Sequence, residues 1–230
     1  MGITANLLDQ ISRLCRQHCL GGSVLTFSRL DTYFHYSRLL ESAARDGHLP
    51  ILNGEVALPP EHPFMNLIHK GGKAFFSSTP QFREKGHPSD KAVFYALGFQ
   101  EVHSVDVSAD VEPDLLFDLN RNDLGAQIGR QYDLVIEAGT MEHIFHVPNV
   151  LKNAFDATRT GGCILHNGPS NHFCDHGFYQ FSPTFYQDYY TANGFDILEI
   201  MFIQTRSNDD PWFVHTYTAG SLARDRKSVV

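Results

Sequence analysis

Apolar and polar residues follow one another along this chain in blocks that predict alternating helices and strands. Between residues 4 and 20 the apolar side chains recur at helical spacing, and Gly21-Gly22 follows them. We therefore predict an N-terminal helix within residues 1–21. Residues 23–28 have the composition of a buried strand, and residues 33–44 return to a helical pattern. The chain is thus expected to open as helix, strand and helix.

Residues 48–90 have a different character. Prolines and a glycine pair interrupt them throughout, at Pro50, Pro59, Pro60, Pro63, Gly71-Gly72, Pro80 and Pro88. Such residues break regular elements. A long stretch without strong periodicity inside a compact domain is commonly functional or inserted. We interpret the segment as an insertion or lid of short elements, without a core of its own.

Regular patterning returns at Ser89, which is suited to cap a helix that Gly98 ends. Four apolar segments then have the length of strands: residues 101–106, 114–118, 132–138 and 163–166. A helical pattern at residues 147–154 separates the last two. A strand, a helix and a second strand in one sheet form a parallel unit with a right-handed crossover.

Two more strands are predicted near the end of the chain, at residues 195–203 and 212–218, with a turn at Asp209-Asp210 between them. They are expected to form an antiparallel hairpin at the edge of the sheet. The order of elements predicts an α/β fold: a Rossmann-like, doubly wound, mostly parallel sheet with a C-terminal antiparallel hairpin and an inserted irregular segment. We expect the 230 residues to form one domain, residues 1–230.

Composition narrows the range of partners. The formal net charge of −8 argues against nucleic acid, because binding to phosphates needs clustered Lys and Arg. No apolar run approaches the ~20 residues that span a bilayer, so no membrane partner is expected. The first residues lack a basic region followed by an apolar block, so we expect a cytoplasmic protein whose four cysteines are free thiols. Assembly into a homo-oligomer stays open.

The candidate chemistry lies at the carboxyl ends of the strands, where parallel α/β sheets bind ligands. Asp106 and Asp118 each end an apolar strand. A carboxylate only accepts hydrogen bonds and can receive two hydroxyl groups at once. Either aspartate alone is equally well explained as a solvated turn residue. Together they favour a binding site.

Several segments carry a resemblance to a known family. They are the strand Tyr132–Ile136, the loop pair Glu142-His143, the turn Thr160-Gly161-Gly162 and the two acidic strand ends. In this combination the chain resembles the class I S-adenosylmethionine-dependent methyltransferases, over roughly residues 20–220. The resemblance implies S-adenosylmethionine as cofactor. It places Asp106 and Val107 at the ribose, Asp118 and Leu119 at the adenine, and Glu137, Ala138 and Gly139 along the cofactor cleft.

The chain departs from that family after its first strand. The family has a Gly-x-Gly-x-Gly turn there, whereas the strand Val24–Phe27 continues here as Ser28-Arg29-Leu30-Asp31. Side chains in this turn would narrow the cofactor pocket. Arg29 is a candidate to pair with the methionine carboxylate, because a guanidinium fork suits that group. The alternative is a surface arginine at the start of a helix.

The candidate acceptor side follows the fifth strand. Residues 166–183 contain three histidines, an aspartate and several aromatic residues. Methyl transfer needs alignment and, for a hydroxyl or amine acceptor, a base. We favour His176 as that base, then His143, with Tyr179 as a third catalytic candidate. The alternative for each histidine is a structural role with a hydrogen bond to the backbone.

The sequence thus predicts an S-adenosylmethionine-dependent methyltransferase that methylates oxygen or nitrogen on a small-molecule or sugar-containing, glycan-type acceptor. One alternative is a methyltransferase-like binding or scaffolding subunit without catalytic activity, which the missing glycines favour. A further alternative is a metal-dependent enzyme that uses the histidine-rich loop at residues 166–176. The donors of that loop lack paired helical spacing, so we assign no metal ligands.

Overall fold

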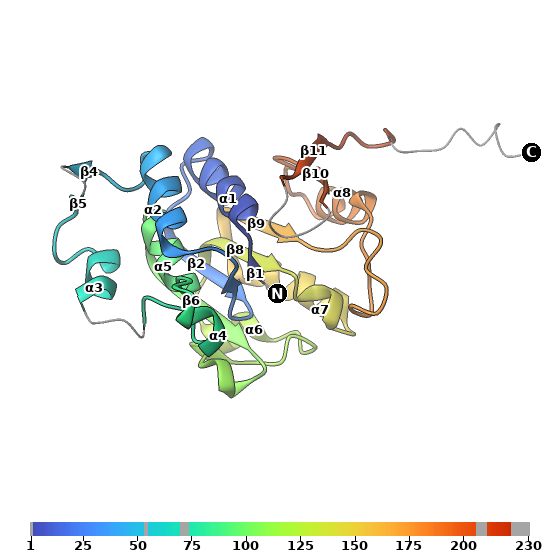
Figure 1. Ribbon diagram of the computed structural model, residues 1–230. Coiled ribbons are helices and arrows are strands. Elements are labelled where there is room, and N and C mark those ends of the chain that lie inside the picture. Colours follow the sequence, from blue (N-terminus) through green and yellow to red (C-terminus); the bar gives the residue numbers. More distant parts are fainter. Residues whose placement is uncertain (1, 53–54, 70–73, 206–210, 222–230) are drawn as a thin grey trace, which may run out of the picture. The chain divides into compact units, whose positions relative to one another are not determined.

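The computed structural model describes residues 2–52, 55–69, 74–205 and 211–221 (Figure 1). The chain divides into two compact units, residues 1–168 and residues 169–230. The prediction of one domain stays a prediction, because a division into compact units does not decide whether they fold together.

A five-stranded parallel sheet forms the centre of the first unit. In chain order its strands are β2 (Gly22–Phe27), β6 (Phe99–Asp106), β7 (Leu115–Leu116), β8 (Tyr132–Ala138) and β9 (Thr158–Asn167). Their order across the sheet is β7-β6-β2-β8-β9. The chain therefore builds outward from β2 in one direction and then returns to its other side with β8. The carboxyl ends of β2 and β8 lie next to each other at this reversal.

The central strands are buried on both faces. Leu25 and Phe27 of β2 and Val135 and Ile136 of β8 are all 0 % exposed. Sheets in which every strand is parallel occur almost only with both faces covered. This is why these strands are continuous apolar runs and do not alternate with polar residues. The predicted strand at residues 132–138 coincides with β8.

Helices flank this sheet (Figure 1). They are α1 (Ala5–Gln17), α2 (Tyr36–Arg45), α5 (Asp90–Ala96), α6 (Leu124–Ile128) and α7 (Val147–Ala157). The first of these packs on α2, and α5 packs on β6, while α7 contacts β8 and β9. The Ser89 hydroxyl accepts a hydrogen bond from the Ala92 amide at 3.2 Å, and Gly98 follows α5 with φ +93°, so both predicted ends of this helix are confirmed.

In the described part of residues 48–89 the elements are short, namely β4 (Ile51–Leu52), β5 (Glu55–Val56), α3 (Pro63–His69) and α4 (Pro80–Glu84). Gly71-Gly72 lies outside the described residues. The later part of this segment is joined to the chain after β2, where β3 (Asp31–Thr32) pairs with β1 (Gly2–Ile3). The Thr79 hydroxyl donates to the Asp31 carboxylate at 2.8 Å, and the Thr32 hydroxyl donates to the Pro88 carbonyl at 2.6 Å.

The second unit contains α8 (Pro183–Ala192) and an antiparallel pair, β10 (Met201–Gln204) and β11 (Phe213–Thr216). The predicted hairpin strands are therefore present, but the first begins only at Met201, so the prediction of a strand over residues 195–200 was wrong. Its predicted turn at Asp209-Asp210 lies outside the described residues. Among the helices of the described ranges, none has the length and apolar character that crossing a bilayer requires.

Candidate functional site

Asp106 ends β6 and directs its carboxylate toward the neighbouring β2. Its Oδ2 accepts a hydrogen bond from the Ser28 hydroxyl at 2.5 Å and another from the Arg29 amide at 3.2 Å. Its Oδ1 accepts one from the Ser108 amide at 2.9 Å. The side chain of Asp106 is half-buried. The carboxylate of Asp106 therefore lies at the end of a strand and accepts three hydrogen bonds from the protein, one from a hydroxyl group and two from backbone amides.

Ser28 takes the place where a glycine was expected. Its φ is +77°, in the left-handed region that non-glycine residues seldom adopt. Its amide donates to the Val105 carbonyl at 2.7 Å, and only 6 % of its side chain is exposed. The turn after the first strand therefore has a glycine-like backbone without a glycine.

Asp118 lies at the same edge as Asp106. The Phe117 amide donates to the Asp106 carbonyl at 2.8 Å, which ties the end of β7 to the end of β6. The Asp118 Oδ1 accepts hydrogen bonds from the Asn120 amide at 2.9 Å and from the Asn120 side chain at 2.8 Å. Asp118 therefore lies in a turn beyond β7. The predicted strand at residues 114–118 was too long.

The residues that follow the two aspartates differ in exposure. Val107 follows Asp106 and is 66 % exposed, which is high for an apolar side chain. Leu119 follows Asp118 and is 4 % exposed, so it belongs to the core. Only Val107 of this pair presents an apolar surface beside the carboxylates.

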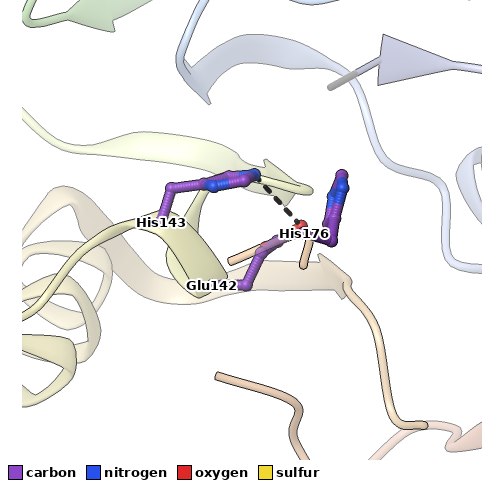
Figure 2. A group of neighbouring side chains, drawn as sticks. All are labelled: Glu142, His143 and His176. Carbon is purple, nitrogen blue, oxygen red and sulfur yellow. Dashed lines mark ion pairs between the residues drawn. The ribbon is translucent and has the colours of Figure 1, made fainter. Parts of the chain in front are cut away.

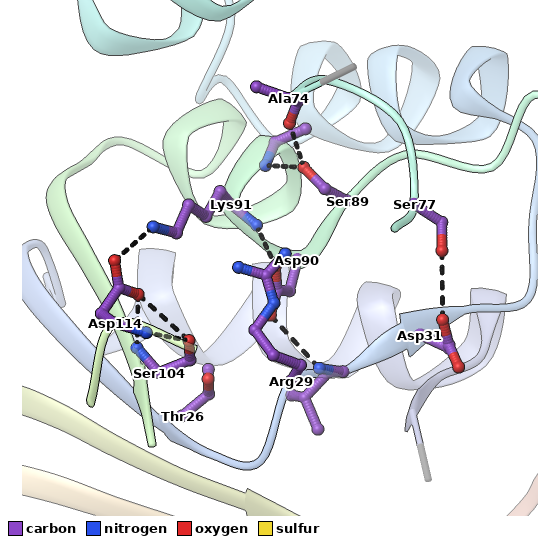
Figure 3. A network of polar contacts seen from close by, with 12 residues as sticks. Thr26, Arg29, Asp31, Ala74, Ser77, Ser89, Asp90, Lys91, Ser104 and Asp114 are labelled. Carbon is purple, nitrogen blue, oxygen red and sulfur yellow. Dashed lines mark hydrogen bonds and ion pairs between the residues drawn. The ribbon is translucent and has the colours of Figure 1, made fainter. Parts of the chain in front are cut away.

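Arg29 makes an ion pair inside the first unit. Its guanidinium lies 3.0 Å from Asp90, and the two side chains are 14 % and 1 % exposed (Figure 3). Asp90 also accepts hydrogen bonds from the Leu30 amide at 3.2 Å and the Lys91 amide at 2.8 Å. Burial raises the pKa of Asp90 above its ordinary value, and the positive charge of Arg29 opposes that rise. Arg29 is therefore not a surface arginine, and it already has a carboxylate partner.

Glu137 is 0 % exposed, and both of its carboxylate oxygens are engaged by the protein. The Thr140 and Met141 amides donate to Oε1 at 2.7 and 3.0 Å. The Nδ1 of His166 lies 3.0 Å from Oε2, because Glu137 and His166 are register partners on β8 and β9. The carboxylate of Glu137 therefore organises the loop that follows β8.

That loop is also joined to β2. Ala138 is 1 % exposed, and Gly139 turns the chain with φ +82°. The Thr140 hydroxyl then donates to the Phe27 carbonyl at 2.8 Å. This hydrogen bond links the ends of the two strands at which the sheet order reverses.

Glu142 and His143 lie in the short 3₁₀ turn Met141–His143 of this loop. The side chain of Glu142 is 2 % exposed, whereas that of His143 is 36 % exposed. Glu142 Oε1 and His143 Nε2 lie 3.9 Å apart (Figure 2). Burial, and to a smaller extent the charge of Glu137, raises the pKa of Glu142 to about 7. A carboxyl group of this kind carries a proton over part of the neutral range.

The second unit holds the remaining predicted residues. His172, Cys174, Asp175 and His176 all have exposed side chains. His176 contacts the ring of Phe173 edge-on, with centroids 5.5 Å apart. Tyr179 stacks on Phe181 at 5.9 Å and belongs to an aromatic cluster that continues into α8. The catalytic roles predicted for His176 and Tyr179 stay predictions.

His166 belongs to the first unit and hydrogen-bonds Glu137. The other proposed donors of the histidine-rich loop belong to the second unit. The metal-dependent alternative stays a prediction.

Hollows in the described part of the first unit include the following two. A shallow depression of about 540 Å³ is lined by Gly129, Arg130 and Phe155 among others, and it adjoins the amino end of β8. A cavity of about 20 Å³ lies between Arg29 and Ser77. The first is at the sheet edge where parallel folds seldom bind ligands. The second has room for about one water molecule.

Sequence reasoning assigned no role to Ser28 or Thr140, and it named His166 only as a donor of the histidine-rich loop. Each is a polar residue at or just beyond the carboxyl end of a strand of the predicted sheet. That position was the signal that could have found them. Comparison of the chain with models of known protein families, with curated proteins and with solved structures found no match.

Proposed function

We propose that this chain is an S-adenosylmethionine-dependent methyltransferase with a Rossmann-like, doubly wound fold. Its acceptor would be a small molecule or a sugar-containing compound, methylated on oxygen or nitrogen. The strand order β7-β6-β2-β8-β9 supports the fold, because it reverses beside the first strand as in open sheets that bind nucleotides. The observation that carries the proposal is the position of Asp106, whose carboxylate lies at the carboxyl end of β6 beside β2, next to that reversal.

The residues at this edge fit the cofactor. Asp106 accepts hydroxyl groups, as recognition of a ribose requires, and the exposed Val107 offers an apolar surface next to it. Asp118 lies at the same edge and would face the adenine. The positive φ of Ser28 gives the first turn the backbone shape that the family obtains from glycine.

In the proposed reaction the cofactor supplies a methyl group on a positively charged sulfur. Glu137 and Thr140 would not contact it through their side chains, because both are used to hold the loop after β8. They would fix the backbone of Ala138 and Gly139 along the cofactor cleft. His143, at the end of that loop and partly exposed, would accept the proton of the acceptor. His176 and Tyr179 remain the candidates from the second unit.

The ion pair between Arg29 and Asp90 changes the role that we propose for Arg29. Its guanidinium pairs with Asp90, and Asp90 also receives the Leu30 amide. Arg29 would therefore hold the turn after β2 in place. To pair with the methionine carboxylate of the cofactor, Arg29 would have to leave the buried carboxylate of Asp90.

The test is calorimetric titration of the intact chain with S-adenosylmethionine and S-adenosylhomocysteine. Asp106→Asn keeps the shape of the side chain but removes its charge, so we expect Kd for both ligands to rise about tenfold or more. Asp133→Asn is the matched control. Asp133 also binds a serine of β2, but Ser23, at the other end of that strand. Loss of affinity in both variants alike would contradict a role for Asp106 in the site.

A second candidate, a binding or scaffolding subunit without catalytic activity, is favoured by one observation. The carboxylate of Asp106 is already occupied by the Ser28 hydroxyl and the Arg29 amide. If the folded wild-type chain binds neither ligand at millimolar concentration, this second candidate replaces the first.

A further inference from the structure

The contact between Ser28 and Asp106 has a consequence for ligand affinity. We propose that Ser28 sets the affinity of this site, because its hydroxyl occupies on Asp106 a position that a ribose hydroxyl takes when the cofactor binds. This inference rests on the proposed function. It concerns a residue at which this chain departs from the family that it resembles.

The hydrogen bonds to Asp106 indicate which carboxylate oxygen a ribose hydroxyl could reach only by displacing a donor of the protein. A carboxylate oxygen accepts about two hydrogen bonds. Oδ2 already receives two, from the Ser28 hydroxyl and the Arg29 amide, whereas Oδ1 receives one, from the Ser108 amide. A ribose brings two neighbouring hydroxyl groups. One of them can join Oδ1, but the second needs a position on Oδ2.

The backbone donors are fixed in place. Ser28 itself is anchored through its amide to the Val105 carbonyl at 2.7 Å, and the adjoining Arg29 side chain is held by Asp90. The Ser28 hydroxyl, in contrast, moves away by rotation about a single bond. It is therefore the donor that gives way, and the ligand replaces one hydroxyl on the carboxylate with another.

Binding then includes the cost of breaking the contact between Ser28 and Asp106. The Ser28 hydroxyl lies 2.5 Å from Asp106 Oδ2, and hydrogen bonds to carboxylate groups are among the stronger ones in proteins. Ser28 as a residue is 6 % exposed, so a displaced hydroxyl gains little solvation. Removing the hydroxyl removes this competition and is expected to tighten binding.

The experiment compares Ser28→Ala with the wild type by calorimetric titration of S-adenosylhomocysteine and of adenosine. Ser28→Ala keeps the Cβ at φ +77° and deletes only the hydroxyl. We expect Kd to fall about tenfold for both ligands. Ser28→Gly, which also removes the backbone constraint, is the second variant in case Ser28→Ala does not fold.

Ser23→Ala is the matched control. Ser23 lies at the opposite end of the same strand, and its hydroxyl donates to Asp133 at 2.7 Å. This variant loses an equivalent hydrogen bond between serine and aspartate but should leave both Kd values unchanged.

The outcomes separate the two proposals. If the wild type binds and the Ser28 variants bind equally or more weakly, the inference is overturned while the assigned cofactor stands. If no folded variant binds either ligand, as judged by calorimetry and a cooperative thermal transition, both the cofactor and the role of Ser28 are overturned.

Discussion

Single residues at the carboxyl edge of the sheet owe their chemistry to burial. Glu142 is the clearest case, since its sequence neighbours do not reveal that its side chain is 2 % exposed. Its carboxyl lies near the charge of Glu137 and 3.9 Å from His143. An ordinary glutamate is ionised at neutral pH, whereas the pKa of Glu142 is raised to about 7.

This shift predicts how stability depends on pH. A glutamate with a raised folded-state pKa stabilises the protein in its protonated form, and that contribution is lost as pH rises from 4.5 through about 7. Glu142→Gln mimics the protonated form. We expect it to change the free energy of unfolding little at pH 4 and to raise it by up to ~3 kcal/mol at pH 8. Urea denaturation across this range measures the difference, and a difference that does not vary with pH would contradict the account.

The elements were largely predictable from local pattern. The strand predicted at residues 132–138 has the bounds that the structure shows, and the helix predicted at residues 147–154 lies within α7 (Val147–Ala157). Both are long, and their apolar or aromatic residues mark them clearly. Such patterns come from burial of one segment against the rest and need no knowledge of distant partners.

The errors arose where local side-chain or backbone contacts end an element earlier than its apolar pattern predicts. The predicted strand at residues 114–118 shrinks to Leu115–Leu116 because the Asp114 carboxylate takes the Ser104 amide and hydroxyl, at 2.9 and 3.0 Å. The N-terminal helix ends before Gly21-Gly22, because Cys19 adopts φ +52° and the Leu20 amide closes on Cys15 at 2.8 Å. The sequence had predicted that Gly21-Gly22 would end this helix.

The loop after β8 is held to β2 by the side chain of Thr140. Thr140→Val keeps the shape of the side chain but leaves the Phe27 carbonyl without the hydroxyl that it receives at 2.8 Å. Since this contact is buried, we expect the free energy of unfolding to fall by about 1–3 kcal/mol. The proposed site should also lose affinity for S-adenosylhomocysteine, because the loop after β8 would lose its side-chain hydrogen bond to the end of β2.

Thr140→Ser serves as the control for that change. It keeps the hydroxyl and should retain most of both the stability and the affinity. Equal losses in the two variants, measured by urea denaturation and titration, would show that the methyl group of Thr140 matters and not its hydrogen bond.

For the molecule as a whole, the sequence located the edge of the sheet that carries the candidate site but not the contacts within it. Asp106, Asp118 and Glu137 were all picked out at strand ends. Their actual partners are distant in sequence: Ser28 is 78 residues from Asp106, and His166 is 29 residues from Glu137. Such pairs depend on strand order and register, which a single sequence specifies only through the complete fold.

The most direct measurement is a crystal structure of the chain bound to S-adenosylhomocysteine. The account predicts both ribose hydroxyls within hydrogen-bonding distance, roughly 2.5–3.0 Å, of the Asp106 carboxylate, with the Ser28 hydroxyl turned away. A nucleoside bound elsewhere, with the Ser28 hydroxyl still on Asp106, would contradict it.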